Sequence, residues 1–270
     1  MKRKAIIVFL SVFFMAVIMS CDEDGGINFF TLEQDVEFGE EFHTQLVNNP
    51  DEYPILSERA YPEAYSHLEA IRNELLKSDD LRYSEEFSWD VYIIENDDVL
   101  NAFCVPGGKM YFYTGIIKFL DNEAEFAGVM AHEMAHADKR HTTKTMTKQY
   151  GFSMLLSALL GDDPGTLAQI AADLAQGLGS LAFSRDHEYE ADEYAVRYTA
   201  DGTGDYNYYP KGISAFFEKM EGQASAPEFL STHPSPDNRL ESIDEFWVSI
   251  GSPDGEDYAS RYQEFKNSLP

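Results

Sequence analysis

The 270-residue sequence predicts an α+β fold that is mainly helical and contains one small β-sheet. Apolar residues recur three or four positions apart along much of the chain, most clearly over 61–75, as in helices packed on a core. The period changes to an alternation over 89–94, which indicates a strand. A Pro-Gly-Gly turn at 106–108 precedes a second β-rich segment, 110–113. We therefore expect a small sheet beside a larger helical part.

The first twenty residues have the character of an export signal. A basic start, Lys2-Arg3-Lys4, precedes an apolar run over 5–19 that is shorter than the roughly 20 residues of a membrane-spanning helix. Residues 18–21 resemble a bacterial lipobox, in which the signal is cut before Cys21 and Cys21 is lipidated. We expect an exported, lipid-anchored protein of the bacterial envelope, in the periplasm, at the outer membrane or at the cell surface. A plain signal peptide or an uncleaved anchor is the alternative.

The rest of the chain divides into three parts. We expect a tether over 21–30, a single domain over 31–250 and a helical extension over 251–270, which is either a cover over a cleft or a terminal helix. Helices are expected over 31–46, 61–75, 122–140, 141–162, 165–183, 185–200, 210–221, 236–248 and 256–267.

The charge limits the possible partners. Asp and Glu number 48 against 20 Lys and Arg, a net charge of −28, so nucleic acid and anionic lipid headgroups are disfavoured. Membrane contact is expected from the lipid on Cys21.

The other cysteine, Cys104, lies in an apolar context and is expected to be a small core residue. No feature of the sequence indicates an oligomeric state.

The predicted helix 122–140 carries the pattern H-E-x-x-H. His132 and His136 are four residues apart, so both imidazoles lie on one face and can reach one metal ion. Glu133 places a carboxylate near the open coordination position, an arrangement that suits zinc-assisted attack of water on a carbonyl. The alternative is a surface helix with two ordinary histidines, but the small flanking residues favour close packing on several sides.

A third zinc ligand is expected on a separate element. In the segment 184–192, Glu188 and Asp192 share one helical face, whereas Glu190 points roughly the opposite way. His187 competes with Glu188 and is rotated about 100° from it. The remaining histidines outside the motifs are expected to be structural or exposed: His43, His67 and His141.

Four blocks together resemble metallopeptidase family 48, the gluzincin zinc peptidases related to the CAAX prenyl protease and HtpX. The blocks are N-A-F-C-V-P-G-G at 101–108 with Gly115, H-E-M-A-H at 132–136, S-R-D-H-E-Y-E-A-D at 184–192, and T-H-P-S-P at 232–236 with Arg239. The resemblance covers residues 31–248 and implies a zincin-like metallopeptidase fold. Because the chain lacks the several membrane helices of multi-pass members, it resembles a soluble, exported branch.

The resemblance implies roles for individual residues. His132, His136 and Glu188 are the implied ligands of one Zn²⁺ per chain. Glu133 is the implied general base, which activates the attacking water and passes the proton to the leaving amine. Asp192 is expected to support a ligand histidine through its second ring nitrogen.

Two further residues are candidates for stabilising the oxyanion on the scissile carbonyl, namely His233 and Arg239. His233 could instead cap the zinc as a fourth ligand and hold the enzyme idle, or be an ordinary loop histidine. The strand after the turn at 106–108 is expected to be a sheet edge facing the cleft, where an extended peptide adds as a strand.

Three functions are consistent with these features. The first is a zinc metalloendopeptidase that hydrolyses unfolded or misfolded cell-envelope proteins, as in protein quality control. The second is a chaperone-like or binding lipoprotein with a zinc site and little turnover. The third is a zinc hydrolase with a non-peptide substrate, since the motif defines the metal better than the substrate. The intact Glu133 favours the first, because a binding protein needs no base there.

Overall fold

A computed structural model describes residues 20–21, 27–150, 164–176, 182–201, 204, 206–221, 228–234 and 238–270. Residues 1–19 of the predicted export signal and the apolar part of the predicted helix beyond residue 150 lie outside the described residues. The end of the predicted tether packs on the domain, because Asn28 and Phe30 are buried and the Asn28 amide donates to Thr143 Oγ1 at 2.9 Å.

The prediction of a mainly helical fold with a small sheet is confirmed. The helices are α2 (Leu32–Val47), α3 (Pro62–Leu75), α4 (Thr114–Phe119), α5 (Glu123–Asp138), α6 (His141–Tyr150), α8 (Pro164–Gln176), α9 (Arg185–Ala200), α10 (Gly212–Glu221), α11 (Phe229–Thr232), α12 (Arg239–Ser249) and α13 (Ala259–Asn267). The strands are β1 (Ser20–Cys21), β2 (Ile27–Asn28), β3 (Val91–Ile94), β4 (Ala102–Val105) and β5 (Lys109–Tyr113). No helix within these described stretches combines the length and apolar character that crossing a membrane requires.

The three-stranded sheet has the order β3-β5-β4. β5 pairs parallel with β3 and antiparallel with β4, with Cys104 opposite Met110. The prediction that the strand after the Pro-Gly-Gly turn is a sheet edge is therefore wrong. Gly107 and Gly108, at φ of 82° and 86°, form the tight turn that returns β5 alongside β4, and β3 covers the other side of β5. The edge next to the predicted metal helix is β4.

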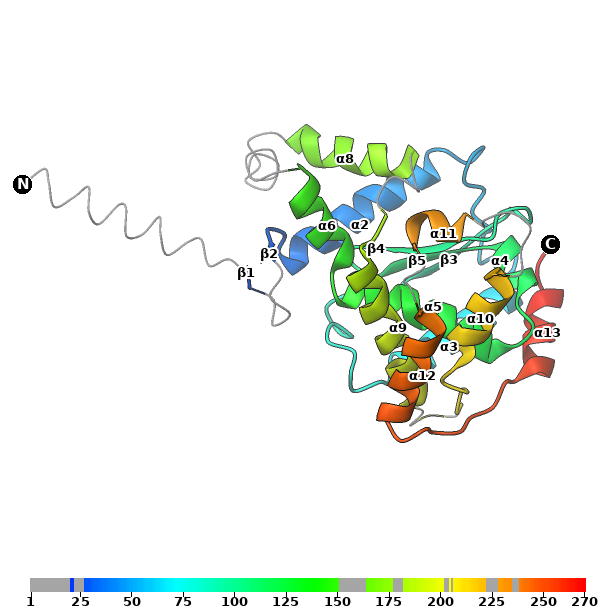
Figure 1. Ribbon diagram of the computed structural model, residues 1–270. Coiled ribbons are helices and arrows are strands. Elements are labelled where there is room, and N and C mark those ends of the chain that lie inside the picture. Colours follow the sequence, from blue (N-terminus) through cyan, green and yellow to red (C-terminus); the bar gives the residue numbers. More distant parts are fainter. Residues whose placement is uncertain are drawn as a thin grey trace, which may run out of the picture.

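Alternate side chains of the sheet enter two different apolar clusters. Ile93, Cys104 and Phe112 belong to the cluster that contains residues of α3, α5 and α9. Ile94 and Tyr111, on the opposite face, belong to the cluster that contains residues of α2 and α8. Figure 1 shows the resulting layers, with α2 and α8 on one side of the sheet and α3, α5 and α9 on the other.

Helix α5 lies at the centre of the larger layer, and every one of its residues is buried. It begins where the Asn122 side chain accepts from the Glu125 backbone N–H at 3.0 Å. Small residues let neighbours approach closely, since a Cβ on Gly128 would overlap the backbone of Ile213 in α10. The helix ends at Asp138, and Arg140 has a left-handed φ of 57°, so the predicted helix from 141 onwards is a separate element, α6.

The C-terminal extension packs on the helical layer. Tyr262 and Phe265 of α13 are fully buried and lie against the ring of Phe126 in α5. The Tyr262 hydroxyl donates to the Ile117 carbonyl at 2.7 Å. Of the two alternatives for this segment, these contacts support a terminal helix.

Candidate metal centre

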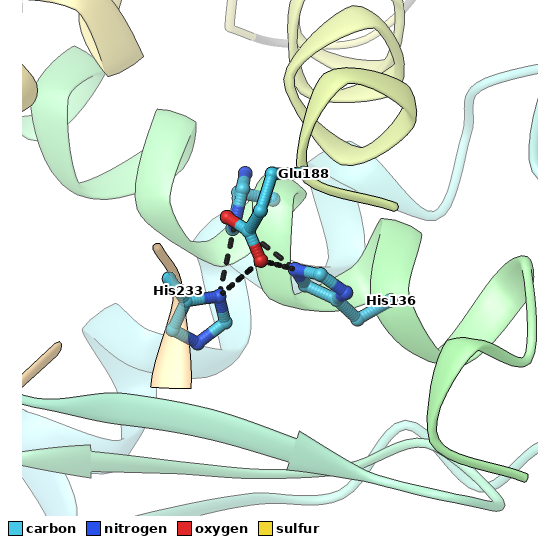
Figure 2. Close-up of side chains that lie close together, drawn as sticks. His136, Glu188 and His233 are labelled. Carbon is cyan, nitrogen blue, oxygen red and sulfur yellow. Dashed lines mark hydrogen bonds and ion pairs between the residues drawn. The ribbon is translucent and has the colours of Figure 1, made fainter. Parts of the chain in front are cut away.

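Four potential ligand atoms from three parts of the chain meet in the interior. His132 and His136 come from α5, Glu188 from α9 and His233 from the residue after α11. One atom of each lies within 4.8 Å of the others, and all four residues are at most 1% exposed. Figure 2 shows the Glu188 carboxylate directed between His136 and His233.

The spacing of these atoms suits a shared metal ion. His132 Nε2 is 3.1 Å from His136 Nε2 and 3.4 Å from His233 Nδ1. The Glu188 carboxylate oxygens are 3.5 Å from His132 Nε2, 3.5 Å from His136 Nε2 and 3.2 Å from His233 Nδ1. Two ligand atoms that each lie about 2.0–2.1 Å from a tetrahedral zinc ion are roughly 3.3–3.5 Å apart. The donor set therefore fits zinc.

The electrostatics of the cluster favour a central cation. Burial disfavours the charged form of Glu188, but His233, His132 and His136 hold its pKa well below the usual range, so the carboxylate is ionised. Burial lowers the pKa of His136 well below its ordinary value, which leaves a neutral imidazole with a lone pair. Glu188 Oε1 forms no well-directed hydrogen bond within the described part of the chain. A buried anion beside a neutral imidazole favours binding of a cation such as zinc.

Asp192 and Arg239 lie behind the ligands. Asp192 Oδ1 is 3.0 Å from His132 Nδ1, and the Arg239 guanidinium donates to Asp192 Oδ2 at 2.7 Å and to Glu188 Oε2 at 2.9 Å. Burial would lower the pKa of His132, but Asp192 and Glu188 raise it to about 9. Arg239 is 3% exposed and its guanidinium lies 3.5 Å from the Phe217 ring centroid. These contacts place Asp192 where a carboxylate orients a ligand histidine, and Arg239 where it holds both carboxylates.

Glu133 lies beside the cluster without joining it. Its Oε2 accepts from the backbone N–H of Cys104 in β4 at 3.1 Å, and its Oε1 is 3.5 Å from His233 Nε2. Burial raises the pKa of Glu133, while His233 and His132 oppose that shift. His233 thus has one ring nitrogen toward the ligands and one toward Glu133. This position is compatible with capping the zinc and with stabilising the oxyanion, the two roles predicted for it. Cys104 is buried, as predicted.

Several residues at the site could not be predicted from the sequence motifs. His141 is fully buried, and its Nδ1 is 2.9 Å from His136 Nδ1. The ring of Phe183 stacks on His136 with centroids 3.9 Å apart, and the ring of Phe229 stacks on His233 at 4.2 Å. The only sequence signal for His141 is its place five residues after His136, which helical periodicity does not bring to the same face.

The competitor His187 does not join the ligand cluster. Its ring stacks on His141 with centroids 4.2 Å apart and an angle of 8° between the rings. Burial lowers the pKa of His187 to about 3.

A small apolar recess opens next to Glu133 and His233. Its walls include Phe38, Phe42 and Phe103, together with Phe183. These rings come from α2, from β4 and from the segment before α9. The recess therefore lies between the edge strand and the candidate metal centre.

Comparison with known proteins defines the class of this protein. Peptidase family M48 matches residues 62–246, which include all of the residues in the cluster, and the chain belongs to this family. Zinc is the metal of the family's peptidases, in agreement with the donor set found here.

The chain resembles several larger proteases over part of their length. It is 32% identical to the beta-barrel assembly-enhancing protease of Yersinia pestis over 162 residues, 55% of this chain and 32% of that protein. It is 32% identical to the mitochondrial metalloendopeptidase OMA1 of Arabidopsis thaliana over 161 residues, 57% of this chain and 31% of that protein. Human OMA1 is 27% identical over 233 residues, 74% of this chain and 43% of that protein. The chain thus spans less than half the length of these relatives.

Proposed function

We propose that this protein is a zinc-dependent endopeptidase that cleaves unfolded or misfolded proteins of the cell envelope. The proposal rests on Glu133, a buried carboxylate beside the four-residue cluster. One oxygen of Glu133 accepts from the backbone N–H of Cys104, and the other faces His233 Nε2. A protein that only binds zinc has no use for a base in this position. The assignment to a peptidase family supports the reaction class.

The residues have separate tasks in the proposed reaction. Zinc, held by His132, His136 and Glu188, would polarise the scissile carbonyl and acidify the attacking water. Glu133 accepts the proton of that water and then delivers it to the leaving nitrogen, which needs the raised pKa that burial gives this carboxyl. His233 would stabilise the oxyanion after its Nδ1 leaves the cluster and frees the fourth coordination position for the water. Arg239 was a candidate for the same role, but its contacts indicate that it supports the reaction by holding Glu188.

The surroundings of Glu133 support an extended, apolar substrate. β4 is the sheet edge next to the site, and an extended peptide can add to such an edge through main-chain hydrogen bonds. The aromatic recess beside Glu133 suits an apolar side chain of the substrate. Unfolded segments offer both features, because folded proteins pair their strands and bury their apolar residues.

Cleavage of casein, an unfolded protein, tests the proposal. We expect the purified chain to cleave casein, to lose activity when the metal is removed with a chelator, and to regain it when zinc is restored. A natively folded protein of similar size is the control and should remain intact. Undiminished cleavage after complete metal removal would refute the proposal. Suppression of casein aggregation without any cleavage would favour the chaperone-like alternative.

We also propose that the protein is exported and anchored by a lipid on Cys21. The basic start, the apolar run over 5–19 and the position of Cys21 support this location. The net charge of −28 disfavours contact with anionic headgroups, so we expect the lipid to attach the protein to the membrane. Expressed in a bacterium, the chain should fractionate with membranes, and Cys21→Ser should release it or leave its signal uncut. Equal membrane association of both forms, with the signal removed from both, would exclude the lipid anchor.

A further inference from the structure

We propose that His141 and Glu190 are positioning residues that hold the ligand His136 in the tautomer and orientation that zinc requires. This inference rests on the assignment of His136 as a zinc ligand and does not depend on which bond the protein cleaves. Sequence considerations placed Glu190 away from the site and gave His141 no link to it.

Two side-chain contacts connect the metal cluster to Glu190 of α9. His136 Nδ1 is 2.9 Å from His141 Nδ1, and His141 Nε2 is 3.0 Å from Glu190 Oε2. These contacts are possible because Arg140 has a left-handed φ of 57°, which turns the start of α6 back against the end of α5. His141 is fully buried, while the Glu190 side chain is 27% exposed.

The order of these contacts selects one tautomer of His136. A neutral imidazole has one N–H, and the short contact between the two Nδ1 atoms has room for a single proton between them. The Glu190 carboxylate accepts only, so His141 carries its proton on Nε2 and presents a lone pair on Nδ1. The short contact between the two Nδ1 atoms then requires His136 to donate from Nδ1. His136 Nε2, the atom that faces the cluster, is left with a lone pair for the metal.

The two ligand histidines of α5 therefore reach a carboxylate in different ways. His132 Nδ1 meets Asp192 directly at 3.0 Å. Within the described part of the chain no carboxylate contacts His136 Nδ1, and His136 reaches Glu190 through His141. Ring stacking fixes the geometry, since Phe183 covers one face of His136 and His187 covers a face of His141.

Variants of both residues separate this role from simple packing. His141→Phe keeps a ring but removes the acceptor, His141→Gln keeps an acceptor, and Glu190→Gln removes the group that selects the tautomer. Glu193→Gln is the matched control, because Glu193 lies on the same helix, has a side chain that is 31% exposed, and pairs with Arg197. Zinc affinity is measured by competition with a chromophoric chelator. The tautomer of His136 is read from its ¹⁵N chemical shifts in the metal-free protein.

We expect His141→Phe to weaken zinc binding by about 10–100-fold and Glu190→Gln to weaken it by about tenfold, the range found when a partner of a metal ligand is removed. His141→Gln should recover most of the affinity, and Glu193→Gln should match the wild type. The ¹⁵N shifts should show a single His136 tautomer, protonated on Nδ1, in the wild type and a mixture in Glu190→Gln.

Two results would overturn the inference. One is zinc affinity within twofold of wild type in both His141→Phe and Glu190→Gln. The other is a wild-type His136 protonated on Nε2 in the metal-free protein. If His141→Phe fails to fold, Glu190→Gln and the ¹⁵N shifts decide the question. Zinc binding without casein cleavage would refute the proposed peptidase function and leave this inference intact.

Discussion

Replacing Glu133 with Gln is expected to lower kcat for casein cleavage by about 10²–10⁴-fold, the usual contribution of a general acid–base residue. Gln has nearly the same shape and can still accept the Cys104 N–H, so the packing of β4 on α5 is retained. It has no site that takes up the proton of the attacking water. Zinc content and KM should therefore stay near the wild-type values, because the cluster atoms and the recess are unchanged.

The measurement combines steady-state kinetics on casein with metal analysis of the same preparations. Glu241→Gln, a change at an exposed position in the first turn of α12, controls for the amide substitution and should leave kcat unaltered. A Glu133→Gln protein that keeps its zinc and cleaves at more than a tenth of the wild-type rate would show that another group is the base.

Replacing Glu188 with Gln is expected to remove both zinc and activity. The neutral amide is a weaker ligand than the carboxylate, and it can no longer balance the charge of Arg239, which donates to Glu188 Oε2 at 2.9 Å. The loss in zinc affinity should be at least the roughly 100-fold reached when a residue behind a metal ligand is changed. Casein cleavage should fall to the level of the chelated wild type.

Chelator competition, with circular dichroism to verify folding, checks this result. Glu193→Gln on the same helix is the control and should keep its zinc. If Glu188→Gln retained full zinc affinity while Asp192→Asn lost it, the ligand from α9 would be Asp192 instead.

The elements that carry the site were predictable because their signals are local. Two histidines four residues apart on a capped helix of small residues must share one face, and the structure keeps that helix from Glu123 to Asp138. The same reasoning placed Glu188 and Asp192 on one face of α9, and both carboxylates point to the histidines of α5. The fold class followed from the change of period between the helices and the strand at 91–94.

The remaining features depend on strand order and on backbone turns, which bring together segments in ways that local sequence patterns do not indicate. Which strand forms the sheet edge depends on strand order, and nothing in the sequence of β4 or β5 distinguishes a central strand from an edge strand. His141 reaches His136 only because Arg140 adopts a left-handed conformation, which is uncommon for arginine and is not signalled by the sequence. The predicted strand start at Trp89 was also two residues early, since Trp89 has φ 51° and precedes β3.

The zinc content of the purified wild-type chain is the most direct test of the central claim, namely that side chains of α5 and α9 hold one catalytic zinc ion. Elemental analysis after gel filtration should find one zinc per chain, and His132→Ala should reduce it to background. A wild-type protein that contains no transition metal and takes up none from added zinc, while still cleaving casein, would contradict the account.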